Sequence, residues 1–223
     1  MISYLKAVPL FASLDPSELD VIYRLSTNLK YPKKKVIFLE NEDGDKLYVI
    51  LKGSVKIIKA SESGEEIILA ILREGEFFGD MSLLDNKPRS ATVITNEDCQ
   101  LMIINRSSFE KMVITYPKIS LKLMKELTSR LRKADELIGS LAFINVNGRI
   151  AGLLLQLADE RGIETDGGVL IKARPTHQEI ANMVISSRET VTRVLKQFEE
   201  KELISMSGKD ITILNRENIR NTI

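Results

Sequence analysis

The first half of the chain contains short apolar runs with the length and composition of β-strands. These runs are rich in Val, Ile and Leu, are separated by turn sequences rich in Gly, Asp, Glu and Ser, and cover residues 33–40, 46–53, 54–61, 65–72, 89–96 and 99–106. Short strands repeated at intervals of about ten residues predict a β-sandwich or a jelly-roll barrel. Two short helices are expected ahead of the strands. One of them, over residues 15–29, opens with a capping Asp15 and a first-turn Pro16.

The pattern becomes helical after Asn105. The sequence from Ser107 to Glu110 has the spacing of a capping box and predicts a short helix. A long helix is then expected from Pro117 to about Ser140. On this helix apolar residues recur at alternating intervals of three and four, the spacing of a coiled-coil seam: Met124, Leu127, Leu131, Ala134, Ile138 and Leu141. We interpret it as a parallel dimerisation helix; the alternative is a helix packed against its own β-domain.

The last third of the chain alternates between helical and strand patterns. An amphipathic helix is predicted over residues 147–161, ending at Gly162, and a strand over 169–171. Two further helices, 176–184 and 186–201, are separated by a tight turn and followed by a hairpin over 203–214. Two helices joined by a tight turn and followed by a hairpin predict a winged helix-turn-helix.

Composition excludes several classes of protein. No run of about 18 apolar residues is present, and the N-terminus lacks the features of a secretory signal, so we expect a cytoplasmic protein without a membrane partner. One cysteine, Cys99, and one histidine, His177, provide neither an iron–sulfur cluster nor a two-histidine metal site. No nucleophile–base pair is visible, which disfavours an enzyme. The net charge of +1 means that any DNA binding needs a local cationic patch.

The second helix of the predicted helix-turn-helix carries such a patch. Residues 186–197 contain three cations, Arg188, Arg193 and Lys196, against one anion, Glu189. These residues lie opposite the apolar stripe that includes Val191. An arginine side chain can bind guanine in the major groove, and a glutamate can accept a hydrogen bond from the cytosine amino group. The pattern therefore predicts a helix that reads DNA bases.

Two segments carry a family resemblance. QEIANMVISSRETVTRVLKQFEEKELI (178–204) and LAFINVNGRIAGLLLQLA (141–158) resemble the family of the cyclic AMP receptor protein and FNR. The resemblance implies that Arg188, Glu189 and Arg193 contact bases. It also implies phosphate contacts from Gln178 and Thr190. His177, beside the cap of the first helix, is expected to contact backbone or phosphate. Ser186 or Ser187 caps the second helix, and Ser187 is placed with the DNA-binding residues. Implied partners are an inverted-repeat operator in double-stranded DNA, a second copy of the chain, and RNA polymerase.

Residues 76–93 carry the second part of the resemblance. They are similar to the phosphate-binding cassette of cyclic-nucleotide-binding domains. The resemblance implies that Gly79, Asp80, Arg89 and Ser90 bind the cyclic phosphate and ribose of a nucleotide, with cyclic AMP the first candidate. An arginine can bind such a phosphate through two nitrogens, and a glycine lets the backbone approach an anion closely. The resemblance extends to essentially the whole chain.

The chain departs from the family pattern at three positions. Asp80 replaces the usual glutamate, and Ala134 and Asp135 replace the Thr–Ser pair that receives adenine. We therefore predict an α+β fold with three parts: a β-roll effector domain over 1–115, a dimerisation helix and hinge over 116–143, and a winged helix-turn-helix over 144–223. The predicted function is a homodimeric transcriptional regulator gated by a cyclic nucleotide. The alternative is a regulator of the same family whose effector pocket is vestigial or differently specific.

Overall fold

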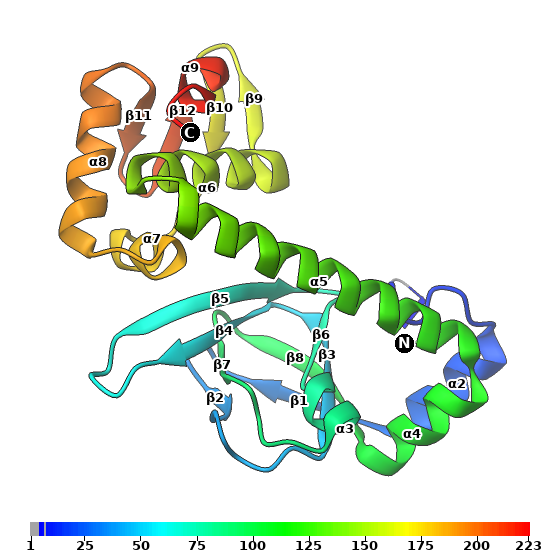
Figure 1. Cartoon of the computed structure of the whole chain (residues 1–223). Coiled ribbons are helices and arrows are strands. Elements are labelled where there is room, and N and C mark those ends of the chain that lie inside the picture. Colours follow the sequence, from blue (N-terminus) through cyan, green and yellow to red (C-terminus); the bar gives the residue numbers. More distant parts are fainter. Residues whose placement is uncertain (1–4, 7) are drawn as a thin grey trace. The chain divides into compact units, whose positions relative to one another are not determined.

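The computed structural model describes residues 5–6 and 8–223. The chain divides into two compact units, residues 1–131 and 132–223, which are described separately (Figure 1). Residues 1–4 and 7 lie outside this description, so the prediction on a secretory signal at the N-terminus falls partly outside the described residues. Among the described residues, no helix combines the length and apolarity needed to cross a membrane.

The first unit is built on two antiparallel sheets of four strands each. One sheet has the order β1-β8-β3-β6 and the other the order β2-β7-β4-β5. Their bounds are β1 Ser26–Tyr31, β2 Val36–Phe38, β3 Lys46–Lys52, β4 Ser54–Ala60, β5 Glu66–Arg73, β6 Phe77–Phe78, β7 Thr92–Thr95 and β8 Cys99–Asn105. Buried side chains such as Ile50, Val55 and Leu101 form a core cluster from both sheets. The predicted β-roll is confirmed.

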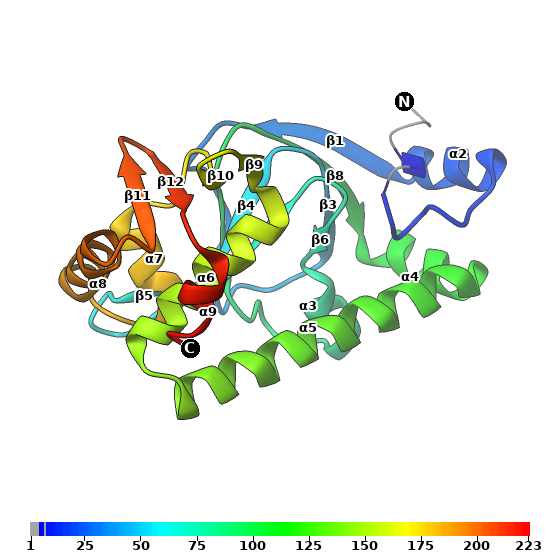
Figure 2. The same ribbon diagram turned by 90° about the horizontal axis from the view of Figure 1, so that it is seen from above.

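Helices complete the first unit: α2 (Pro16–Arg24), α3 (Asp80–Asp85), α4 (Arg106–Thr115) and the start of α5 (Pro117–Phe143). A second core cluster joins α2, α4 and α5 to the first sheet through residues such as Phe109 and Ile119. Figure 2 shows α2 and α4 at the same end of the β-roll. Ile119 and Leu123 are buried, so the first turns of α5 pack on their own β-domain.

Two predicted helix boundaries in this unit were wrong. The Asp15 side chain caps α2 by accepting from the Ser17 and Glu18 amides, but α2 ends at Arg24 rather than Leu29. Residues 26–31 instead pair with β8 as strand β1, which satisfies their backbone groups along a full ladder. Helix α4 is capped by Asn105, which accepts from the Ser108 amide, and not by Ser107.

The second unit is a winged helix-turn-helix, as predicted. It contains α6 (Val146–Arg161), α7 (His177–Val184), α8 (Arg188–Glu200) and α9 (Arg216–Arg220). Its antiparallel sheet has the order β11-β12-β10-β9, with β9 Ile163–Thr165, β10 Gly168–Ile171, β11 Ile204–Ser207 and β12 Asp210–Ile213. The core joins these helices to the sheet through residues such as Leu154, Val191 and Phe198. Strand β9 and helix α9 were not predicted.

Arg149 on α6 fixes the turn between α7 and α8. Its guanidinium donates to the carbonyl oxygens of Val184 (3.0 Å) and Ile185 (3.4 Å) in that turn. It also donates to the carbonyl of Ile144, just after α5, at 2.8 Å. Ile185 has a φ of 53°, an unfavourable conformation for a β-branched residue, so the turn depends on its surroundings.

Candidate functional site

Arg89 is a buried cation in the loop that follows α3. Only 4% of its surface is exposed, and its guanidinium donates to the carbonyl oxygens of Gly79 (2.9 Å) and Lys46 (3.0 Å). The guanidinium carbon also lies 4.2 Å from the centre of the Phe38 ring. Burial lowers the pKa of Arg89. Its Nε is buried and has no hydrogen-bond partner among the described residues, so the site retains an unused donor.

Two glycines let the backbone approach this guanidinium. Gly79 has a φ of 84°, and a Cβ there would lie 2.7 Å from a terminal nitrogen of Arg89. A Cβ at Gly44 would lie 2.7 Å from Arg89 Nε and 2.6 Å from the Cβ of Ser82. Any side chain at either position would therefore collide with the cation or its neighbours. In the sequence, Gly44 lies in the turn between two predicted strands, residues 33–40 and 46–53, and was not predicted as a site residue.

Asp80, the first residue of α3, is paired with a cation from α5. Its side chain is 2% exposed, and Arg130 Nη1 lies 3.2 Å from its Oδ1. Arg130 also donates to the carbonyl of Phe77 at 2.6 Å and lies over the Phe77 ring. Arg130 was not among the site residues predicted from the sequence. The pair connects the predicted effector loop to the long helix within the first unit.

The other predicted effector residues differ in their surroundings. Ser90 is exposed, and its hydroxyl contacts the sulfur of Met81 at 3.4 Å. The structure thus brings Gly79, Asp80, Arg89 and Ser90 into one region around α3. Ala134 and Asp135 are exposed residues of α5 and belong to the second unit. Base recognition by these two positions stays a prediction.

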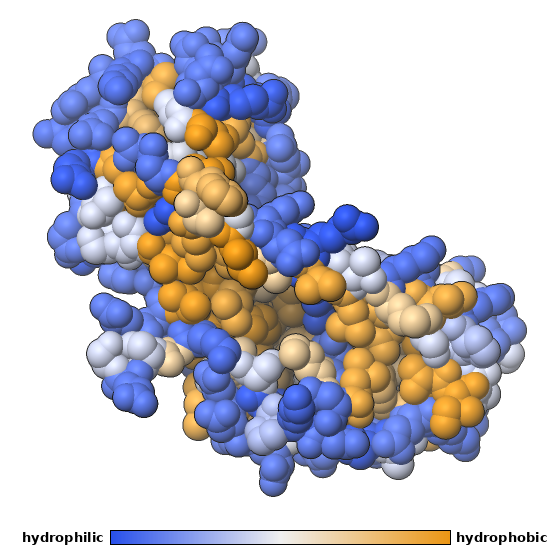
Figure 3. All heavy atoms as spheres, viewed as in Figure 1, coloured by the Kyte–Doolittle hydropathy of each residue, from blue (hydrophilic) through white to orange (hydrophobic). Residues whose placement is uncertain are grey.

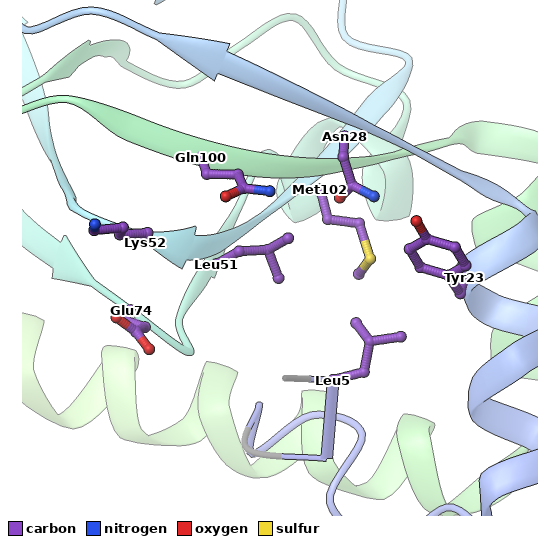
Figure 4. Close-up of a pocket in the computed structure, with 8 residues that line it drawn as sticks. All are labelled: Leu5, Tyr23, Asn28, Leu51, Lys52, Glu74, Gln100 and Met102. Atoms are coloured by element: carbon purple, nitrogen blue, oxygen red, sulfur yellow. The ribbon is translucent and has the colours of Figure 1, made fainter. Parts of the chain in front are cut away.

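A cavity of about 390 Å³ lies elsewhere in the first unit. Figure 4 shows polar groups of Asn28, Gln100 and Tyr23 on one side of it and Leu5 opposite. It is lined by Leu5, Tyr23, Asn28, Leu51, Lys52, Glu74, Gln100 and Met102. None of these residues belongs to the predicted effector loop, so this cavity is separate from the Arg89 site.

Helix α5 exposes much of its predicted seam. Met124 is 54% exposed, Leu131 63%, Ile138 65% and Leu141 40%, while Ala134 is also exposed. Leu127 is partly buried against the core of the first unit. Figure 3 shows hydrophobic side chains exposed along the course of α5. A row of apolar side chains open to water is typical of a surface that binds a partner.

The predicted DNA-reading helix exposes its polar face. In α8, Val191, Val194, Leu195 and Phe198 are buried. Ser187 caps the helix by accepting from the half-buried Thr190, and Arg188, Glu189 and Arg193 are exposed. Hydrogen bonds from its own amide and from Ser187 lower the pKa of Glu189, which favours the ionised acceptor. On α7, the exposed Gln178 contacts Asn182 at 2.8 Å.

A hydrogen bond links the two helices of this motif. The Nδ1 of His177, the first residue of α7, lies 2.8 Å from Thr192 Oγ1 on α8. The Thr192 hydroxyl also donates to the carbonyl of Arg188 at 2.9 Å. Burial, followed by the charges of Arg174 and Arg188, lowers the pKa of His177. The sequence predicted a backbone or phosphate contact for His177, and its bond to Thr192 was not predicted.

The winged helix-turn-helix and the β-roll with its buried arginine define a class of protein: a DNA-binding regulator with a small-molecule-binding domain. Two family models match the chain: a cyclic nucleotide-binding domain over residues 28–116 and a Crp-like helix-turn-helix domain over residues 148–222. The chain belongs to the cyclic AMP receptor protein (CRP) family of transcriptional regulators. This confirms the predicted family and fold class.

Relatives and solved structures agree with this assignment. The chain is 39% identical to a cAMP-activated global transcriptional regulator of Salmonella typhimurium over 82% of this chain and 88% of the relative. It is 31% identical to a CRP-like cAMP-activated regulator of Mycobacterium tuberculosis over 94% of each chain. A c-di-GMP-responsive global regulator of Xanthomonas campestris has a similar structure, with a TM-score of 0.81 and 27% identity over 90% of this chain and 100% of the other.

Proposed function

We propose that the protein is a homodimeric, sequence-specific DNA-binding transcriptional regulator gated by a cyclic nucleotide bound beside Arg89. The proposal of a bound nucleotide rests on the burial and hydrogen bonding of Arg89. This cation is buried against neutral carbonyl oxygens, and its Nε is an unused donor. Buried charges in proteins are normally paired, and a cyclic phosphate would supply the missing anion. The protein would act by binding and not by catalysis.

The identity of the nucleotide is a separate part of the proposal. Two relatives are named as cAMP-activated, and a structural relative is described as c-di-GMP-responsive. Cyclic AMP is our first candidate because those relatives share the higher sequence identity. Ala134 cannot form a side-chain hydrogen bond, and Asp135 accepts hydrogen bonds when ionised. These two residues are the main support for the alternative, in which the pocket is vestigial or selects another nucleotide.

The dimer proposal rests on the seam of α5. Leu131 and Ile138 are each more than 60% exposed, and they lie two helical turns apart on the same face. A second copy of α5 would cover both residues with the same side chains related by a two-fold axis. Effector binding in the β-roll would then alter how two α5 helices pair and so reposition the two DNA-binding units.

The DNA proposal assigns α8 to the major groove. Arg188, Glu189 and Arg193 would contact bases, because they share the exposed face of this helix. Gln178, Thr190, Ser187 and His177 would lie near the phosphates. A two-fold dimer predicts an inverted repeat with half-sites about one helical turn apart, with a TGTGA-like sequence by family resemblance. RNA polymerase is the expected protein partner, and the cytoplasm is the expected location.

Calorimetric titration with a panel of cyclic mono- and dinucleotides tests the gating. We expect saturable binding of one nucleotide, and affinity about ten- to a hundredfold lower in Arg89→Leu, because a charge-assisted hydrogen bond is lost. Ala134→Thr together with Asp135→Ser should raise affinity for cyclic AMP if base recognition has diverged. If none of these nucleotides binds and the protein recognises a specific DNA sequence without one, the alternative with a vestigial pocket is established.

A further inference from the structure

Thr192 lies on the DNA-reading face of α8 with its hydroxyl already engaged. The hydroxyl donates to the Arg188 carbonyl at 2.9 Å and contacts His177 Nδ1 at 2.8 Å. Since a hydroxyl has one proton, Nδ1 of His177 is the donor in the second bond. The side chain of Thr192 is nevertheless exposed, one helical turn from Arg188 and beside Arg193.

These bonds determine which group of Thr192 is available to DNA. The Cβ of threonine carries one hydroxyl and one methyl group. With the hydroxyl held by two groups of the protein, the methyl is the free end of the side chain. A threonine methyl in the major groove makes an apolar contact with the 5-methyl group of thymine.

We propose that Thr192 is a further specificity-determining residue, which recognises a thymine methyl, and that His177 is the residue that positions it. This inference rests on the proposed major-groove placement of α8. It assigns His177 a part in base selection without contact to a base. The neutral imidazole suits this role. Its Nε2 is buried without a partner among the described residues, so a proton there would be an unpaired buried donor. The charges of Arg174 and Arg188 also disfavour a positive charge on the ring.

The test replaces thymine by uracil in DNA. A duplex operator is first selected from random sequences with the wild-type protein, with or without the nucleotide that binds it. Each thymine in a half-site is then replaced by deoxyuridine, which lacks only the 5-methyl group, and affinity is measured by fluorescence anisotropy. We expect one thymine per half-site at which this change weakens binding about fourfold per contact, the contribution of one buried methyl group.

Variants connect that thymine to the two residues. Thr192→Ser keeps the hydroxyl and removes the methyl, so the thymine–uracil difference should disappear; Thr192→Val keeps the methyl and should keep the difference. His177→Ala releases the Thr192 hydroxyl and should reduce the difference. His177→Asn should restore it, because the side-chain amide can place a donor near the position of Nδ1. A residue needed only for folding would change affinity for both duplexes equally.

The outcomes separate this inference from the proposed function. If the wild type selects an operator but no thymine responds to loss of its methyl group, or if the response persists in Thr192→Ser, the inference is overturned and the DNA-binding function stands. If the wild type binds all duplexes alike, the proposed function itself fails. Circular dichroism of each variant confirms that the fold is retained.

Discussion

The carboxylate of Asp80 and the guanidinium of Arg130 lie 3.2 Å apart, although the two residues are 50 positions apart in the sequence. Asp80 opens α3 beside the predicted phosphate site, and Arg130 lies on α5. Their side chains are 2% and 30% exposed. The pair is therefore a direct electrostatic link between the predicted effector loop and the helix that carries the predicted dimer seam.

Removing the cation of this pair should destabilise the first unit. Arg130→Met leaves the Asp80 carboxylate buried beside an apolar side chain, and we expect a loss of about 1–3 kcal/mol, less than for a fully buried pair because Arg130 is partly exposed. Urea unfolding of the full chain measures this loss. In a double-mutant cycle with Asp80→Asn, the two losses should not add; simple additivity would show that the pair contributes no coupling.

A charge in the predicted dimer seam should give monomers. Leu131→Asp would bury two unpaired carboxylates near the two-fold axis of a dimer, which costs far more than an exposed substitution. Light scattering of the purified variant should report the mass of one chain. Leu121→Asp, at an exposed α5 position outside the seam residues, is the matched control and should keep the mass of the wild type. A dimer of normal mass for Leu131→Asp would contradict the seam assignment.

Glu189 is the most selective probe of base reading. Phosphates repel a carboxylate, so Glu189 is tolerated in the groove only where it accepts from a specific base. Glu189→Ala should reduce discrimination at one base pair per half-site by about 1–3 kcal/mol and leave the salt dependence nearly unchanged. Gln178→Ala should weaken binding to all sequences alike. Selection from random duplexes that returned the same motif for Glu189→Ala and the wild type would remove Glu189 from the reading face.

The environment of His177 predicts a pH dependence of stability. Burial and nearby arginines lower the pKa of folded His177 below its ordinary value of 6.5. The unfolded chain therefore binds a proton at higher pH than the folded chain does. The contribution of neutral His177 to stability is complete above about pH 6.5 and is lost as the pH falls toward the lower folded pKa. Thermal unfolding of wild type and His177→Gln between pH 8 and pH 5 should show the wild type losing more stability on acidification; parallel curves would contradict the prediction.

The apolar pattern of the sequence predicted most of the fold because the long elements bury either one face or a continuous run. The apolar stripe of α8 is buried on one face, whereas the run of β3 is buried on both faces. Strand β9 was not predicted because all three of its residues are exposed, so buried and exposed positions do not alternate along it. Residues 26–29 of strand β1 were assigned to a helix because no residue of this strand is more than half-buried, so no apolar pattern distinguishes it.

The site was predictable where a local motif carried it and not where distant residues meet. Gly79, Asp80, Arg89 and Ser90 lie in one continuous segment, so a sequence motif could identify them. Arg130 and Gly44 contact that segment from other parts of the chain. On α5, Arg130 is one of several polar residues between seam positions, and its local sequence does not distinguish it from a solvent-exposed arginine. The bond between His177 and Thr192 likewise depends on the packing of two helices.

Arg149 connects two separate segments of the second unit. Its three hydrogen bonds join the chain at Ile144, just after α5, to the Val184–Ile185 turn that precedes α8. A change in chain direction at Ile144 would therefore be expected to strain or shift that turn. A lysine has a single nitrogen and cannot reproduce this planar, three-way attachment. Under the proposed function, loss of Arg149 would therefore uncouple the two activities: nucleotide binding and DNA recognition would each persist, but one would no longer affect the other.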